Sequence, residues 1–249
     1  MDNMLGILGG MGPLASAEFV KAIYEHNVLG NQEQDAPRII LYSNPSIPDR
    51  TNYLLKGDYD VLLMNLIDAV HQLSELQVSK IIICCVTSHY LLPKFPAKLK
   101  EKIISLVDVS LREVLECQGR YLLLSTNGTR QLKVFQTSEL WKMTEDKIIL
   151  PDEKDQNYIH NMIYQIKVNK QSFDSAIIFL KNLMKKYEVN SVISGCTEIH
   201  LLNRYLHSQI NQHQGDVADC IFLDPLMIIA TRLEKFLCES FLEIPVSIL

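Results

Sequence analysis

The chain has 249 residues, of which 47% are hydrophobic and 21% charged, so it can bury one large core or two modest ones. Its formal net charge of −5 argues against a nucleic-acid-binding surface, which is ordinarily basic. The first residues lack the positive charge and apolar run of a signal peptide, and no stretch reaches the roughly 18 apolar residues of a membrane helix. We therefore expect a soluble globular protein of the cytoplasm that contacts neither nucleic acid nor membrane.

The first half of the chain alternates apolar strands with helices. In chain order, the patterns predict strands over residues 4–8, 38–42 and 81–84, and helices over 14–27, 60–76 and 97–116. A glycine turn follows the first strand, and the loop 43–51 is too rich in proline and polar residues for regular structure. The helix 97–116 is expected to break near Val107 and Asp108.

The second half repeats this alternation. The patterns predict strands over residues 121–125, 147–150, 191–195 and 221–223, and helices over 130–139, 156–167, 173–187 and from Asp224-Pro225 through Cys238. Such alternation predicts the α/β class with parallel sheets. Because the halves resemble each other, we expect two similar lobes across a cleft. Residues 1–107 plus 212–249 would form the lobe that carries Cys85, and 108–211 the lobe that carries Cys196.

Cys85 and Cys196 each follow a buried strand and precede a helix, which is where open α/β sheets bind ligands. A helix N-terminus favours the thiolate, so a pair of such thiols is suited to moving protons. One thiolate removes a proton from carbon, and a thiol on the opposite face returns one. Each cysteine taken alone is equally compatible with a structural role. Cys84 is expected to lie in the core.

Substrate carboxylates at such a site would need cations and donors, and the residues offer Arg50, Lys167, Thr129 and helix amides. Both cations are also compatible with solvated surface positions. The glycine loop 6–12 lacks the G-x-G-x-x-G spacing, so NAD is not expected, and a tight turn without a ligand is the alternative. Cys84, Cys85 and His89 lack the paired spacing of a zinc site, so no metal is expected.

Four motifs in this order resemble the aspartate/glutamate racemase family of cofactor-independent amino-acid racemases. They are G-I-L-G-G-M-G-P at 6–13, N-P-S-I-P-D-R-T at 44–51, C-x-T-x-H at 85–89 and G-C-T-E-I at 195–199. The glutamate that follows Cys196-Thr197, Glu198, resembles the aspartate racemase branch of the family. The glutamate racemases of cell-wall synthesis usually carry histidine at this position.

The resemblance implies two α/β/α lobes related by a pseudo-twofold axis, an active site in the cleft between them, a homodimer, and no pyridoxal phosphate or metal. It also implies that Cys85 and Cys196 are the acid/base thiols. The resemblance and the neighbouring positions give ten substrate-binding candidates: Met11, Arg50, Val86, Thr87, Ser88, Gly128, Thr129, Lys167, Thr197 and Glu198.

Val86 departs from the family, which commonly has asparagine at this position and thereby offers a polar side chain to the substrate. The leading hypothesis is a racemase that interconverts L- and D-aspartate, with glutamate also possible. Because Val86 removes that contact, two alternatives stay open. They are another enzyme of the superfamily acting on diacids, such as a maleate-type isomerase or a decarboxylase, and a non-catalytic relative that binds an amino acid or a partner protein.

Overall fold

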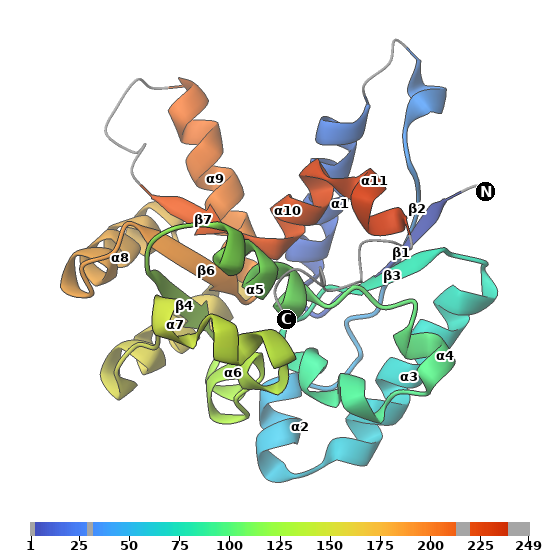
Figure 1. Cartoon of the computed structure of the whole chain (residues 1–249), viewed down its shortest axis with the longest axis horizontal. Coiled ribbons are helices and arrows are strands. Elements are labelled where there is room, and N and C mark those ends of the chain that lie inside the picture. Colours follow the sequence, from blue (N-terminus) through green and yellow to red (C-terminus); the bar gives the residue numbers. More distant parts are fainter. Residues whose placement is uncertain (1–2, 29–31, 213–219, 239–249) are drawn as a thin grey trace.

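We describe a computed structural model of the chain, which covers residues 3–28, 32–212 and 220–238. Within these residues the strands form two parallel sheets, one of three strands and one of four (Figure 1). We call the parts built on them the first and the second lobe. The prediction of an α/β protein with two parallel-sheet lobes is confirmed.

The first lobe is built on a sheet with the order β2-β1-β3. Its strands are β1 (Met4–Gly9), β2 (Arg38–Ser43) and β3 (Lys80–Ile83). Its helices are α1 (Pro13–Asn27), α2 (Arg50–Lys56), α3 (Tyr59–Glu75) and α4 (Ala97–Lys100), with short 3-10 turns at Glu33–Asp35 and Thr87–Lys94. The central strand β1 pairs in parallel with both neighbours. Its Ile7 lies opposite Leu41 of β2 on one side and Ile82 of β3 on the other.

The second lobe is built on a sheet with the order β5-β4-β6-β7. Its strands are β4 (Tyr121–Ser125), β5 (Ile148–Ile149), β6 (Ser191–Gly195) and β7 (Ile221–Leu223). The helices from α5 onward are α5 (Leu106–Glu116), α6 (Asn127–Gln131), α7 (Glu153–Lys167), α8 (Phe173–Lys186), α9 (Glu198–Gln212), α10 (Pro225–Thr231) and α11 (Leu233–Leu237). Further 3-10 turns are Phe135–Thr137, Glu139–Met143 and Glu145–Lys147.

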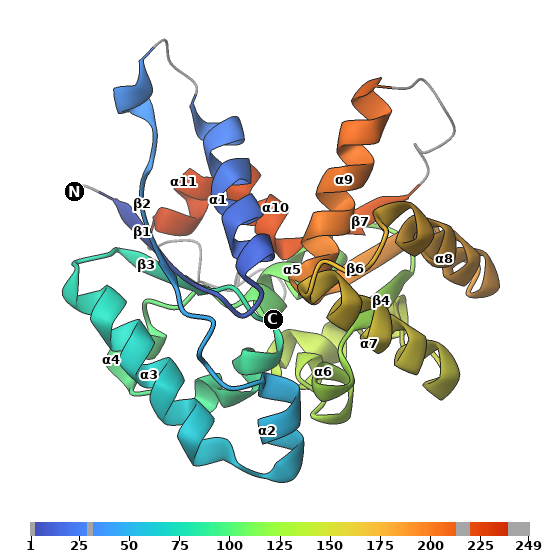
Figure 2. The ribbon, with the colours of Figure 1, turned by 180° about the vertical axis from the view of Figure 1, so that it is seen from behind.

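One apolar core joins the two lobes. It contains residues from both sheets, such as Ile7 of β1 and Ile193 of β6, together with Val109 of α5 and Ile229 of α10. Helix α10 lies between α1 and α9 in both ribbon views (Figures 1 and 2). Since buried apolar area is the main favourable term in folding, this shared core holds the lobes together.

The end of the chain divides between the lobes. We expected residues 212–249 in the first lobe, but β7 pairs with β6, with Ile221 opposite Ser191, so this strand belongs to the second sheet. Helix α10 does contact α1 of the first lobe. Residues 213–219 and 239–249 of the tail lie outside the described residues. A boundary near Val107 stays a prediction, and this residue falls inside α5.

Three predicted helices differ from the structure, and the last one, predicted from Asp224-Pro225 through Cys238, is divided at Arg232 into α10 and α11. The helix over 97–116 breaks at residues 101–105, because this segment lies along β3 and Ile104 donates to the carbonyl of Ile81 at 2.9 Å. The helix predicted over 130–139 is wrong: α6 starts earlier, and Lys133 with its φ of 53° leads into 3-10 turns. Tertiary pairing overrides the helical pattern in the first case, and a left-handed residue ends the helix in the second.

Candidate active site

The two thiols lie at the carboxyl ends of β3 and β6, in turns that contact each other. Cys85 and Cys196 are 6% and 5% exposed. The Oγ1 of Thr197 donates to the carbonyl of Cys84 at 3.4 Å, which joins the two turns. Cys84 itself is fully buried in the shared core, and burial raises the pKa of its thiol well above its usual value. The predicted ranking of Cys84 as a core residue therefore agrees with its surroundings.

Three threonine hydroxyls connect the lobes beside these turns. The Oγ1 of Thr87 lies 3.1 Å from that of Thr126 and 2.9 Å from that of Thr129. Thr126 caps α6 by accepting from the amide of Thr129 at 3.1 Å. This arrangement fixes the N-terminus of α6 against the first lobe, and helix N-termini attract anions.

Arg50 is buried and holds the loop around it. Its guanidinium donates to the carbonyl of Met11 at 2.8 Å and to those of Ile47 and Pro48 at 3.2 and 3.0 Å. Burial lowers its pKa, but the charges of Cys85, Asp49 and Glu198 outweigh burial and raise the pKa above its usual value. The guanidinium therefore lies within electrostatic reach of Cys85. Arg50 is therefore buried and does not lie at a solvated surface position, which was the alternative that its residue type left open.

Lys167 is the last residue of α7 and faces the same region from the second lobe. Burial lowers the pKa of its ammonium, but the charges of Glu198, Cys196 and Cys85 raise it above its usual value. The Nζ lies 4.4 Å from the ring centre of Tyr164, one turn earlier on α7. Lys167 therefore places a positive charge within electrostatic reach of both thiols.

Cys196 is paired with a carboxylate. Its Sγ donates to Oε2 of Glu198 at 2.7 Å, and burial together with this charge raises the pKa of the Cys196 thiol well above its usual value. A Cβ added to Gly12 would lie 2.2 Å from Oε1 of Glu198, so this glycine leaves the space that the carboxylate occupies. Glu198 consequently sits at the N-terminus of α1, where the helix dipole favours a negative charge.

The remaining predicted residues lie nearby, but two of them have other partners. Val86 is 2% exposed and packs in the shared core, and the buried Ser88 donates its hydroxyl to the carbonyl of Cys85 at 2.7 Å. Met11 is buried in the first lobe. A Cβ on Gly128 would lie 2.7 Å from Oγ1 of Thr51, so α6 and α2 approach closely here.

Sequence reasoning missed one link between the lobes. The hydroxyl of Tyr164 donates to the Asp49 carboxylate at 2.9 and 3.0 Å. Two sequence features could have indicated this hydrogen bond. Asp49 lies inside the N-P-S-I-P-D-R-T motif. Tyr164 precedes Lys167 by three residues, so these two side chains lie on one face of a helix.

Two polar atoms at this site are buried without a hydrogen-bond partner among the described residues, Nε of Arg50 and Oε1 of Glu198. Buried polar atoms are normally paired, so this donor and this acceptor are open to a further partner. The described residues contain no group of three or more His, Cys, Asp or Glu side chains that could hold a metal ion. Nor does any helix among them have the length and apolarity to cross a membrane.

The model of the Asp/Glu/Hydantoin racemase family matches residues 8–230. The chain belongs to this family of racemases, which are isomerases. Its relatives include a Bacillus subtilis protein named broad specificity amino-acid racemase RacX, 24% identical over 83% of this chain and 90% of the relative. Both this match and the family assignment agree with the resemblance seen in the four motifs.

Solved structures of racemases share the fold of this family member. Picrophilus torridus aspartate racemase superposes with a TM-score of 0.75 at 20% identity, over 93% of this chain and 94% of that chain. Glutamate racemase from Francisella tularensis superposes with a TM-score of 0.61 at 16% identity, over 98% of this chain and 84% of that chain. At these identities the two superpositions establish the two-lobed fold.

Proposed function

We propose that this protein is a cofactor-independent racemase of acidic amino acids, with L- and D-aspartate as the first substrates to test and glutamate as the second. The observation that carries the proposal is the meeting of two strand-end cysteines from different lobes with Arg50 and Lys167. Two thiols for the two faces of a carbon, and two cations for two carboxylates, match the needs of this reaction. The names of the racemase relatives support the same class.

In the proposed mechanism, Cys85 and Cys196 act on the α-carbon from opposite faces. The thiolate of one removes the α-proton, and the thiol of the other donates a proton to the opposite face, which inverts the centre. Glu198 holds the proton on Cys196. We therefore assign the role of proton donor in the resting protein to Cys196 and the role of base to Cys85.

The ten expected binding residues divide by chemistry. Lys167 and the unpaired Nε of Arg50 supply positive charge for the substrate carboxylates, and Thr87, Thr129 and Thr197 supply hydroxyls. Val86 and Ser88 contribute through the backbone turn that carries Cys85, because their side chains are buried elsewhere. Val86 packs in the core and offers no polar side chain to a substrate, so another enzyme of the superfamily acting on diacids stays the alternative.

The test is incubation of L-aspartate with the protein in D₂O without added cofactor. We expect D-aspartate that carries deuterium at the α-carbon. Cys85→Ser and Cys196→Ser should each lower racemisation at least about 1,000-fold, in line with the size of acid/base effects. Cys117→Ser is the matched control, because this half-buried thiol lies at the end of α5. If neither exchange nor inversion occurs with aspartate or glutamate, the proposal fails.

A homodimer remains our expectation from the family resemblance, and a cytoplasmic location remains our expectation from the sequence. Size-exclusion chromatography with light scattering would measure the mass in solution, and a mass equal to that of one chain would contradict the dimer.

A further inference from the structure

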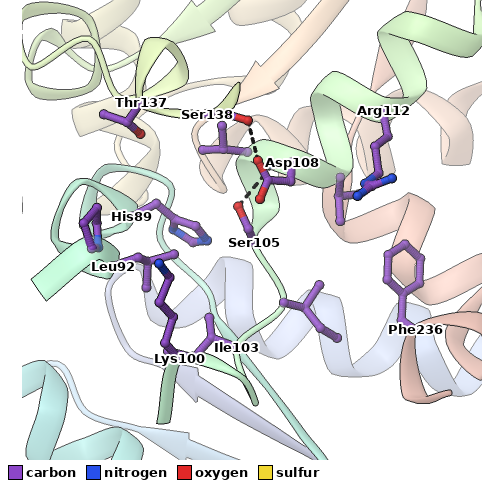
Figure 3. Close-up of a pocket in the computed structure, with 14 residues that line it drawn as sticks. His89, Leu92, Lys100, Ile103, Ser105, Asp108, Arg112, Thr137, Ser138 and Phe236 are labelled. Atoms are coloured by element: carbon purple, nitrogen blue, oxygen red, sulfur yellow. Dashed lines mark hydrogen bonds between the residues drawn. The ribbon is translucent and has the colours of Figure 1, made fainter. Parts of the chain in front are cut away.

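A cavity lies between the lobes, outside the residues to which we give roles in racemisation. It has a volume of about 240 Å³. Its described lining comes from both lobes and includes His89, Leu92, Lys100, Asp108, Arg112 and Phe236 (Figure 3). Sites for drug-sized ligands are typically about 300–1,000 Å³, so this volume suits a smaller molecule.

His89 connects this cavity to the turn that carries Cys85. The Nδ1 of the imidazole lies 2.9 Å from the carbonyl of Cys85, and Nε2 lies 3.0 Å from the amide of Leu106. Because an amide only donates, Nε2 accepts and Nδ1 carries the proton. The ring is thus a fixed neutral bridge between the N-terminus of α5, which borders the cavity, and the backbone of a catalytic thiol.

The lining combines apolar residues with charged residues, and its positive charges outnumber its negative ones. Lys100 and Arg112 contribute two positive charges and Asp108 one negative charge, while Leu92 and Phe236 are apolar. Figure 3 shows Lys100 and Leu92 on the side opposite Arg112 and Phe236, with Asp108 between them. Asp108 accepts from the Ser138 hydroxyl at 2.5 Å, which compensates part of its charge.

The helix end adds to this positive character. Ser105 caps α5 by accepting from the amide of Asp108 at 3.1 Å, and its own hydroxyl proton remains available for donation. The positive end of the α5 dipole faces the same space, since Ser105, Val107 and Asp108 line it. A cavity with a positive bias, one hydroxyl donor and an apolar wall suits a small organic anion.

We propose that this cavity is a second ligand site, which takes a small organic carboxylate of about the size of an amino acid and is coupled through His89 to Cys85. A ligand seated against His89 and the start of α5 acts on the two hydrogen bonds that hold the Cys85 turn. Coupling of this kind is reciprocal, so a substrate in the thiol site changes the affinity of the second site by the same factor. The inference does not depend on the substrate of the thiol site.

The test is isothermal titration of the full chain with L-aspartate, D-aspartate, succinate and inorganic phosphate. We expect at least one carboxylate to bind at two sites. Lys100→Gln removes an exposed cation of the lining, and Thr137→Trp adds bulk from the exposed rim, so each should weaken the second site at least tenfold. Lys98→Gln is the matched control, because this exposed lysine lies two residues from Lys100 and does not line the cavity.

The outcomes separate the ligand sources and the coupling. Binding of succinate as well as aspartate indicates a general carboxylate site, whereas binding of aspartate alone indicates an amino-acid site. Carboxylate binding that Lys100→Gln and Thr137→Trp leave unchanged, binding of phosphate only, or equal weakening by Lys98→Gln would overturn the proposal. The bound ligand should change the turnover of the unmodified protein and of Lys98→Gln at least twofold but not that of Thr137→Trp, and an unchanged rate would overturn the coupling. The titration does not require activity. A protein that binds a carboxylate in this cavity but racemises neither aspartate nor glutamate would therefore refute only the racemase proposal.

Discussion

At the scale of single residues, the two thiols have unlike neighbours. Cys85 lies beside the guanidinium of Arg50, which is itself fixed by three backbone carbonyls. Cys196 instead donates to the carboxylate of Glu198. The carboxylate holds the proton on Cys196, and a two-base reaction needs one acid and one base at its start.

Glu198→Gln tests this difference. The negative charge of Glu198 contributes to the raised pKa of Cys196, so its removal should lower that pKa and let the thiolate form at lower pH. The measurement is the pH dependence of alkylation of Cys196 by iodoacetamide, followed by peptide mass spectrometry. Glu153→Gln is the control, since this exposed residue lies at the start of α7. A midpoint that stays in place or moves upward would contradict the role of Glu198.

Lys167→Gln tests the positive charge offered to the substrate. A hydrogen bond to a charged group contributes about 1.5–3 kcal/mol, so we expect KM to rise roughly 10- to 100-fold. The measurement is steady-state racemisation of aspartate. Lys170→Gln changes an exposed lysine three residues further on and should leave KM unchanged. Equal effects of both variants would show that Lys167 acts only through the overall charge of the protein.

At the scale of elements, helices from the two lobes are joined on both sides of the thiols. The N-terminus of α1 meets Glu198 of α9 through Gly12. On the other side, α2 approaches α6 through Thr51 and Gly128, and Asp49 before α2 binds Tyr164 of α7. These contacts restrict the relative motion of the lobes around the site.

Tyr164→Phe removes one of these links and should lower the free energy of unfolding by about 1.5 kcal/mol, because it deletes a hydrogen bond to a charged group that is partly exposed. Urea unfolding followed by circular dichroism measures this change. Tyr158→Phe lies on the same helix with 54% of its side chain exposed, and we expect no measurable effect. Equal stability of the two variants would argue against a stabilising link between the lobes.

At the scale of the whole molecule, a buried polar cluster ties the end of the chain to the second lobe. Asp224 caps α10 and accepts from Nδ1 of His200 at 2.7 Å and from Asn203 at 3.0 Å, both on α9. Burial raises the pKa of Asp224, but the charge of His200 and these hydrogen bonds outweigh burial and lower it below its usual value. Ionised Asp224 therefore stabilises the fold.

Acid should weaken the protein through this cluster. A carboxyl with a folded-state pKa below its unfolded value near 4 contributes stability above that pH, which is lost as the pH falls through the folded pKa. We expect the urea midpoint to fall progressively below about pH 4. Asp224→Asn should be less stable at pH 7 and should show a smaller loss between pH 4 and pH 2. An equal acid loss in both proteins would assign it to other carboxyls.

The sequence by itself determined the strand and helix alternation, the α/β class and the positions of the two thiols. Each of these depends on local pattern: apolar runs predict buried strands, and a cysteine that directly follows such a run lies at its carboxyl end. The ranking of Cys84 below Cys85 also came from the sequence, by comparison with the single cysteine at the end of β6.

Only the tertiary structure decided which distant segments pair. It placed β7 in the second sheet, broke the helix after Lys100 by pairing Ile104 with Ile81, and joined Asp49 to Tyr164. It also gave Arg50 three backbone partners. Local periodicity shows which side of an element is buried but carries no information on what covers that side, because the partner is selected by packing between residues far apart in the chain.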